Sequence, residues 1–545
     1  MKHFTCVVLI IFLLFAFVIP SFANEVNKFA VNALVQGGSE SRITISGKNV
    51  TDLYAYEAVI SFDSDALEVR GVTSGLKGFS VSPRVEGNKL IVAFTKVGEV
   101  PGEKGNITLN TITFRSKKTG ISQVKLESIT VVDSTLSAST YYPNSAVTVT
   151  HKGSVYKQDT TSSSDGRKVT GTLSDYNFED MFSKAEADER GIKTVEVEIS
   201  GSTAANVYIL RIPAALLADE VTTKYIIIRT PIGRISIPNN IMKKEWIDGV
   251  KYVSIVIQKI DPDTLEQPIR EKIRSRPAIK LGILLDDKEF QWSKPDSFVQ
   301  VIMPYHPTEQ EAVSHEHLVV WYIDNELNVI PVPTGRFNPE LQEISFVTNH
   351  FSMYAVTFVE KTFDDIQNHW CQKYVEVMAS KGIIKGYTDR FFGVHDNISR
   401  ADYLTLHIRA LGISAEVDDN FADVKTDKYY YETLGTAKKL GLVNIKDDLF
   451  RPDEPITRED MMVFTASVLN FSNGYIHHGT IEDLNQYTDV DSISPEAVES
   501  VAILVKEGII EGNNNELFPK NYLTRAEAAT VLYRMYNKLW GNLDN

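Results

Sequence analysis

The chain has 545 residues, of which 43% are hydrophobic and 10% aromatic, and a formal net charge of −15 at pH 7. This length is too great for one hydrophobic core and indicates three to five globular domains. The acidic charge argues against nucleic acid or an anionic membrane surface as the main partner.

The first residues have the pattern of a secretory signal peptide. A short basic start precedes an apolar run over residues 6–18, and Ser21 and Ala23 supply the small residues of a cleavage site. The run is short for a membrane span, so we expect residues 1–23 to be removed on export. After cleavage Cys371 is the one remaining cysteine, and no internal disulfide can form.

Short alternating segments over residues 24–150 predict a β-sandwich. The clearest strand runs from Tyr54 to Phe62. Its alternation places five residues on one face: Tyr54, Tyr56, Ala58, Ile60 and Phe62. Further strands are expected at residues 67–69, 89–94, 108–114 and 123–132, separated by turns that contain glycine, proline or asparagine.

This region resembles a cohesin module. The resemblance is carried by the Tyr54–Phe62 strand with residues 49–50 before it and residues 63–69 after it, and by residues 94–98 and 109–114. It implies a jelly-roll sandwich whose flat face binds dockerin modules.

One departure from the cohesin pattern bears on the partner. Where well-studied cohesins carry Asn-x-Asp, this chain has Ala55-Tyr56-Glu57. The resemblance therefore implies that Glu57 offers a carboxylate to a dockerin-bearing protein, with altered specificity because the amide is lost. A spacer or a carbohydrate-binding sandwich are the alternatives.

Residues 151–166 are polar and predict a linker, and residues 167–359 predict a β-rich domain of unknown function. A helix is expected within residues 174–190, with Ser174 as its N-cap. His315 and His317 would share one strand face at a spacing that suits a metal. No third ligand is evident nearby, so we favour hydrogen-bonded histidines and expect no metal and no cofactor. The sequence contains no nucleophile elbow and no phosphate-binding glycine loop, so we expect no catalytic residues.

A short phrase recurs three times near the C-terminus, around Arg400, Arg458 and Arg525. A period of roughly 60 residues indicates three similar units stacked on one another. Helical periodicity begins near residue 361, and the repeats are expected at residues 361–414, 415–475 and 484–540.

Each phrase has the pattern of a capped helix start. Ser399, Thr457 and Thr524 suit N-caps, and an acidic residue follows three positions later in each copy. Each arginine then occupies the first helical position, where the helix dipole disfavours a positive charge. One interpretation is an acidic ligand held by arginine and free backbone N–H groups. The other is that each arginine pairs with a nearby acid and only holds its repeat together.

The repeats resemble S-layer homology domains. The shared pattern is Phe-x-Asp-Val, Gly-Ile-Ile-x-Gly, Phe-x-Pro and Thr-Arg-Ala-Glu, in three tandem C-terminal copies. The resemblance implies a mostly helical, pseudo-threefold unit that binds secondary cell-wall polysaccharide, often pyruvylated, in grooves between repeats. Three groups of residues are implied as ligand-binding: Arg400, Arg458 and Arg525; supporting Asp365, Asp423 and Asp489; and Trp370, which would stack on sugar.

The copies are not identical, so we expect unequal grooves. The aromatic at Trp370 becomes Tyr429 in the second repeat and Glu496 in the third. The third groove is therefore expected to be the weakest on aromatic grounds.

Together these patterns predict a multidomain, non-catalytic protein exported to the cell wall of a Gram-positive-type bacterium. The C-terminal triplet would bind wall polysaccharide, and the sandwich would display a site for a dockerin-bearing protein of a cellulosome-type complex. Alternatives are a subunit of an S-layer lattice, a surface carbohydrate-binding protein, and an enzyme within residues 167–359.

Overall fold

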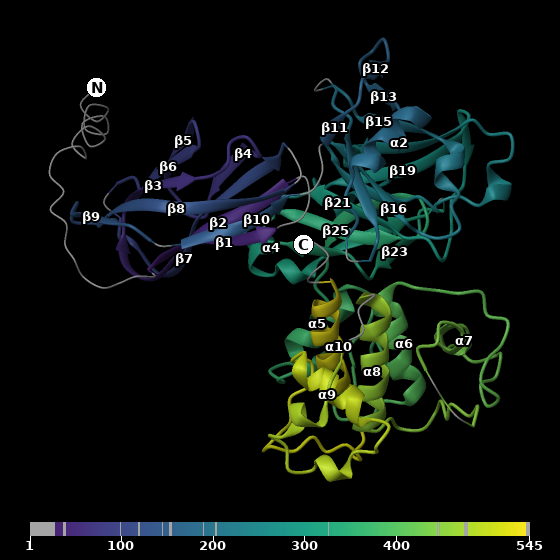
Figure 1. The fold of residues 1–545 in the computed structure, drawn as a ribbon. Coiled ribbons are helices and arrows are strands. Elements are labelled where there is room, and N and C mark those ends of the chain that lie inside the picture. Colours follow the sequence, from purple (N-terminus) through teal and green to yellow (C-terminus); the bar gives the residue numbers. More distant parts are fainter. Residues whose placement is uncertain are drawn as a thin grey trace.

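The computed structural model describes residues 28–540 except 36–39, 99, 118–119, 144, 152–154, 189, 202–203, 325, 340, 444, 446 and 474–477. The expected signal peptide lies outside the described residues. Figure 1 shows a β-sandwich beside a larger β-rich domain, with a helical domain packed against the latter. We call these the sandwich, middle and helical domains.

The sandwich domain consists of two antiparallel sheets around one core. One sheet has the order β1-β2-β7-β4, and the other has the order β10-β8-β3-β6-β5, with β9 paired to β8. The strands are β1 Phe29–Val35, β2 Glu40–Leu53, β3 Ala55–Ser61, β4 Leu67–Ser74, β5 Phe79–Glu86, β6 Lys89–Thr95, β7 Glu103–Ser116, β8 Gly120–Val132, β9 Ala138–Tyr141 and β10 Ser145–His151. The predicted alternation is confirmed for four of the five residues, because Tyr56, Ala58, Ile60 and Phe62 are all at most 4% exposed. Tyr54 precedes β3 and is only half-buried.

The middle domain packs two large mixed sheets around a second core. The first sheet has the order β11-β14-β16-β17-β21-β25-β24, and the second has the order β12-β13-β15-β18-β19-β26-β22-β23, with β20 paired to β19. The strands are β11 Val155–Lys157, β12 Thr160–Ser162, β13 Lys168–Thr172, β14 Lys193–Glu198, β15 Val207–Pro213, β16 Lys224–Thr230, β17 Gly233–Pro238, β18 Tyr252–Ile260, β19 Ala278–Leu285, β20 Lys288–Phe290, β21 Val299–Pro304, β22 Leu318–Ile323, β23 Val329–Val332, β24 Arg336–Asn338, β25 Glu343–Thr348 and β26 Met353–Phe358. The helices are α2 Asp175–Lys184, α3 Gln267–Ile273 and α4 Glu309–Val313.

The segment expected as a linker contributes strands instead. β11 pairs in parallel with β14, and β12 pairs with β13, so residues 155–162 extend one edge of each sheet. A polar, extended chain cannot form a core, but its backbone can still hydrogen-bond to an open sheet edge. The predicted N-cap of α2 is confirmed, since the Ser174 hydroxyl accepts a hydrogen bond from Asn177 N at 3.1 Å.

The histidine pair of the middle domain does not lie on a strand. His315–His317 form a 3₁₀ turn, η4, because this segment connects α4 to β22. The His317 ring Nδ1 contacts the Val359 carbonyl at 3.1 Å, as expected for hydrogen-bonded histidines. In the described part of the chain no three potential metal ligands of the His, Cys, Asp or Glu type lie close together.

The helical domain has one core to which all three repeats contribute. Its helices are α5 Gln372–Ser380, α6 Arg400–Leu411, α7 Tyr431–Lys439, α8 Arg458–Asn473, α9 Val498–Lys506 and α10 Arg525–Trp540. Cys371 is fully buried in this core, and burial raises the pKa of its thiol to about 11. Among the described residues, none of the helices combines the length and the hydropathy that crossing a membrane requires.

Candidate functional site

Three short extended segments meet at the centre of the helical domain and join the repeats into a ring. Ile398 N donates to the Leu523 carbonyl, Leu523 N donates to the Ile456 carbonyl, and Ile456 N donates to the Ile398 carbonyl, each at 3.0 Å. All three side chains are buried. Each repeat therefore contacts both others, as a pseudo-threefold unit requires.

The predicted helix starts are confirmed. The hydroxyls of Ser399, Thr457 and Thr524 accept hydrogen bonds from the backbone N–H three residues later, at 3.1, 3.1 and 3.3 Å. α6, α8 and α10 begin at the three arginines. Each arginine thus has its backbone set at the first helical position of a capped helix.

The backbone N–H groups at these helix starts are already bonded, so the free donors assumed in the first interpretation of the arginines are not found there. The N–H groups of Arg400, Arg458 and Arg525 each donate at 2.9 Å to a carbonyl of the following repeat in the ring. The next N–H group in each helix also donates to that repeat, at 2.9–3.3 Å. Closure of the ring therefore uses the donors that a ligand would need.

The arginine side chains also reach across the junctions. Their Nε atoms donate to the carbonyls of Phe450, Leu517 and Phe392, at 2.9, 2.8 and 2.9 Å. Arg400 forms an ion pair with Asp460, and Arg458 Nη1 contacts Glu527 Oε1 at 3.1 Å. These two arginines pair with the capping acids of the next repeat, and their side chains are only 11% and 13% exposed.

Arg525, at the junction of the third repeat with the first, has different surroundings. Its guanidinium carbon lies 4.6 Å from the ring centroids of both Tyr387 and Phe392, a cation–π arrangement. Its Nη2 donates to the Lys385 carbonyl at 2.9 Å. Among the described residues no ion pair joins this guanidinium to a carboxylate, and its close contacts are with two aromatic rings and two backbone carbonyls.

The aspartates implied as supporting residues hold the loops that receive the arginines. Asp365 accepts hydrogen bonds from three successive backbone N–H groups, those of residues 392–394, at 2.6–3.3 Å. Asp423 and Asp489 each accept two, in the corresponding loops. Burial acts to raise the pKa of Asp365, but the N–H groups outweigh it and hold the pKa below its usual value.

The arrangement of these aspartates bears on the two interpretations of the arginines. None of the three forms an ion pair with a repeat arginine among the described residues. Each aspartate binds a loop through its N–H groups, while an arginine of the neighbouring repeat binds the same loop through a carbonyl. The residues are brought together, but through backbone and not through direct contact.

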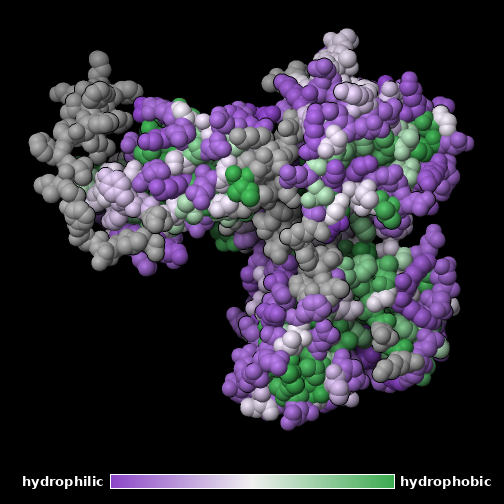
Figure 2. Space-filling view, viewed as in Figure 1, coloured by the Kyte–Doolittle hydropathy of each residue, from purple (hydrophilic) through white to green (hydrophobic). Residues whose placement is uncertain are grey.

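Several aromatic side chains are exposed on the helical domain. Trp370 is 58% exposed, Tyr387 58% and Phe391 47%, so their faces are open to a ligand. Tyr429 is 65% exposed, but its hydroxyl donates to Asp402 Oδ1 at 2.5 Å across the junction of the first two repeats. Figure 2 shows hydrophobic residues gathered at the surface of this domain.

Tyr387 was not predicted as a site residue, although a signal for it exists in the sequence. It directly follows the Gly-Ile-Ile-x-Gly motif of the first repeat, whereas the third repeat has Asn513 at that position. Its contact with Arg525 depends on closure of the ring.

Glu57 lies on the outer face of the β10-β8-β3-β6-β5 sheet. It is exposed, and its neighbours across the strands are Ala93 on β6 and Thr130 on β8. The carboxylate is therefore accessible on a face that offers few other charges at that point.

Comparison with known proteins finds one protein family that matches the helical domain. Residues 362–404, 420–462 and 486–529 match the S-layer homology domain. Each matched range lies within the corresponding predicted repeat.

Curated proteins match parts of the chain. An amylopullulanase of Thermoanaerobacterium thermosulfurigenes is 31% identical over 223 residues, 41% of this chain and 12% of that protein. A cellulosome-anchoring protein of Acetivibrio thermocellus is 36% identical over 19% of this chain and 25% of its own length. A surface-layer 125 kDa protein of Lysinibacillus sphaericus is 26% identical over 30% of this chain and 14% of its own length. The chain thus spans a quarter or less of these relatives.

Solved cohesin structures are similar to part of the chain. A non-cellulosomal cohesin of Archaeoglobus fulgidus is 19% identical and covers 23% of this chain and 91% of its own, with a TM-score of 0.19. A chain from a cohesin–dockerin complex of Clostridium thermocellum is 19% identical. The match covers 23% of this chain and 99% of that chain, with a TM-score of 0.20. The family assignment therefore rests on the helical domain: the C-terminal part of this chain is a tandem of three S-layer homology domains.

Proposed function

We propose that this protein is a non-catalytic cell-surface anchoring protein. Its S-layer homology triplet binds cell-wall polysaccharide without a covalent bond, and its sandwich domain displays a binding face for a second protein. The observation that carries the proposal is the match of three S-layer homology domains to repeats that close into a ring with an arginine at each junction. The middle domain then positions the sandwich relative to the anchor.

The junction at Arg525 is the best candidate for an acidic sugar. Arg400 and Arg458 already have carboxylate partners, and a ligand would have to displace them. Arg525 has none among the described residues, and the ring of Tyr387 beside it is 58% exposed. A carboxylate on a glycan, such as a pyruvyl group, could pair with Arg525 while a sugar ring stacks on Tyr387.

If Arg525 is the residue that binds the acidic sugar, the other residues of the predicted site have different roles. Arg400, Arg458 and the three aspartates act through the shape of the ring, because their polar atoms are bonded inside it. Trp370 remains a stacking candidate because of its exposure. The grooves are then unequal because the three arginines differ in their carboxylate partners, and not only because the nearby aromatic side chains differ.

Retention of the full chain on purified cell walls tests the anchoring proposal. We expect Tyr387→Ala to weaken retention about tenfold with little effect on folding, because the side chain is exposed. Arg525→Ala should weaken retention at least as much. Arg534→Ala, on the same helix and paired with Glu511, is the matched control and should bind normally. Unchanged retention of folded Tyr387→Ala and Arg525→Ala would contradict the assignment of this junction.

For the sandwich domain, we propose a dockerin-bearing protein as the partner, through the face that carries Glu57. A pull-down from the secreted proteins of the source organism would identify it. Glu57→Ala should reduce capture, whereas Glu86→Ala, on strand β5 two strands away in the same sheet, should not. Formation of ordered sheets by the purified protein, without capture of any dockerin, would instead favour an S-layer lattice subunit.

A further inference from the structure

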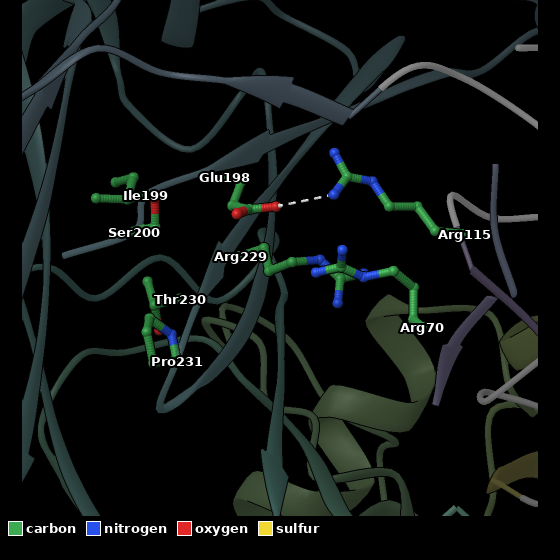
Figure 3. Close-up of a pocket in the computed structure, with 8 residues that line it drawn as sticks. All are labelled: Arg70, Arg115, Glu198, Ile199, Ser200, Arg229, Thr230 and Pro231. Carbon is green, nitrogen blue, oxygen red and sulfur yellow. Dashed lines mark ion pairs between the residues drawn. The ribbon is translucent and has the colours of Figure 1, made fainter. Parts of the chain in front are cut away.

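A cleft between the sandwich and middle domains is lined by arginines from both sides. Its volume is about 190 Å³, more than a single ordered water needs. Arg70 on β4 and Arg115 on β7 enter from the sandwich, and Arg229 on β16 enters from the middle domain (Figure 3). Glu198 is the one carboxylate among the eight lining residues. The lining is therefore positive, in a chain of net charge −15.

The same interface contains a related arrangement in which a carboxylate is already present. Glu343 of the middle domain accepts a hydrogen bond from Arg42 Nη2 of the sandwich at 2.9 Å and another from Arg234 Nη2 at 2.8 Å. Its side chain is only 12% exposed. One carboxylate between two guanidinium groups thus joins the two domains.

In the cleft, by contrast, no carboxylate of the lining lies between Arg70 and Arg229. Figure 3 shows the guanidinium groups of Arg70 and Arg229 pointing toward one another, while Glu198 turns toward Arg115. The contact from Arg115 to Glu198 is long, at 4.0 Å. Arg70 forms an ion pair with Glu68, and Arg229 forms one with Glu196, and neither of these two acids lines the cleft.

Guanidinium groups that converge on one space repel each other. An oxyanion between them replaces repulsion with attraction, and the planar donors of arginine suit carboxylate and phosphate oxygens. We propose that this cleft binds an oxyanion, a phosphate or carboxylate group, between Arg70 and Arg229 with Arg115 beside it. The group is either a free small anion or an acidic substituent of a polymer. Bound there, it joins the two domains as Glu343 does.

Calorimetric titration of the full chain tests this site, with inorganic phosphate and a short polyphosphate as probes at ionic strength held constant with chloride. We expect saturable binding of phosphate, weakened at least tenfold by Arg70→Gln with Arg115→Gln. Tighter binding of polyphosphate, lost in the same variant, would identify a polymer-borne group as the natural ligand. Binding of phosphate alone would identify a free anion.

The matched control is Arg84→Gln. Arg84 pairs with Glu86 two residues along β5, as Arg70 pairs with Glu68 along β4, but it lies in the other sheet and outside the cleft. Phosphate binding should be unchanged in this variant. Absence of saturable binding, or equal binding by wild type and the double variant, would overturn the proposal.

A second measurement covers the case in which the double variant does not fold. Phenylglyoxal modifies accessible guanidinium groups, and phosphate should slow its reaction with Arg70 in the wild-type chain but not with Arg84. Equal protection of the two arginines would show general association of anions and would also overturn the proposal.

Discussion

The middle domain contacts its two neighbours through interfaces of different character. Toward the sandwich it uses ion pairs, of which the central one is Arg42–Glu343–Arg234. Toward the helical domain it uses one ion pair, from Glu316 to Lys373 at 2.7 Å, and the carbonyls of the turn between β23 and β24. There Lys381 Nζ donates to the Gly335 carbonyl at 2.8 Å, and the Tyr536 hydroxyl donates to the Pro333 carbonyl at 2.9 Å.

The two interfaces also differ in burial and packing. Lys381 and Tyr536 are 3% and 2% exposed. At the sandwich interface the side chains are more exposed: Arg42 15%, Arg234 24%, Arg115 25% and Arg70 46%. A Cβ added at Gly382 would lie 2.8 Å from the ring of Pro331, so the backbones themselves are close. Buried donors to carbonyls resist salt, while partly exposed ion pairs are screened by it. The middle domain is therefore bound firmly to the anchor and more adjustably to the sandwich.

The largest effect is expected from Tyr536→Ala. The change removes a fully buried ring and its hydrogen bond to Pro333, and should lower the free energy of unfolding of the helical domain by about 3–5 kcal/mol. Urea denaturation followed by tryptophan fluorescence measures it. Tyr522→Ala removes the same group from a site that is 56% exposed and should cost far less. Equal losses of unfolding free energy in the two variants would mean that burial of Tyr536 in the interface adds no stability.

Next comes the pH dependence that Lys381 gives to the same interface. Burial, with the nearby Arg336 charge, lowers the pKa of Lys381 from 10.5 to about 7. Between these values the unfolded chain holds a proton that the folded chain has lost, so the free energy of unfolding rises with pH by up to about 1.4 kcal/mol per unit. Below pH 7 both states are protonated and this contribution is flat.

Lys381→Met removes the titrating group and should abolish that slope. Denaturation curves from pH 7 to pH 10, recorded for both proteins, measure the difference. An identical slope in the variant would contradict the assignment to Lys381.

A smaller effect is expected from Glu343→Gln at the sandwich interface. Loss of the charge weakens two charge-assisted hydrogen bonds in a partly exposed site, at a cost of about 1–2 kcal/mol. A double-mutant cycle with Arg42→Gln measures the coupling. Glu309→Gln is the control, because Glu309 pairs with Lys77 across the same interface but is 94% exposed. A similar loss of stability in Glu309→Gln would contradict the expectation that the less exposed ion pair contributes more.

The smallest effect should come from salt. Raising sodium chloride from about 0.05 to 0.5 M shortens the screening length several-fold. We expect the sandwich interface to lose less than about 1 kcal/mol, and the helical interface, which has one ion pair beside its buried hydrogen bonds, to lose less than the sandwich interface. Hydrogen exchange of amides at the two interfaces reports both in one experiment. Equal loosening of the two would remove the distinction drawn between them.

Local patterns in the sequence were sufficient for several features. The alternation of Tyr54–Phe62 specified which residues enter the sandwich core, because side chains of a strand point to opposite faces in turn. The three capped helix starts followed from a hydroxyl and an acid three positions apart, since this pairing forms within one turn. The repeat period likewise predicted three units stacked on one another, and the structure shows that they share one core.

Other features depended on contacts that no local pattern contains. Arg525 meets Tyr387 from the far end of the triplet, and its lack of a carboxylate partner distinguishes it from Arg400 and Arg458. Residues 155–162 became strands only because two sheet edges were open to them.

The arginine cleft joins strands of two separate domains, so its charges could not be placed together from the sequence. The sequence by itself determined the alternation of the Tyr54–Phe62 strand and the places where the repeat helices begin. The tertiary structure decided which charges meet, because a side chain's partner across a junction is chosen by how the domains and repeats close on one another, and not by its neighbours in the chain.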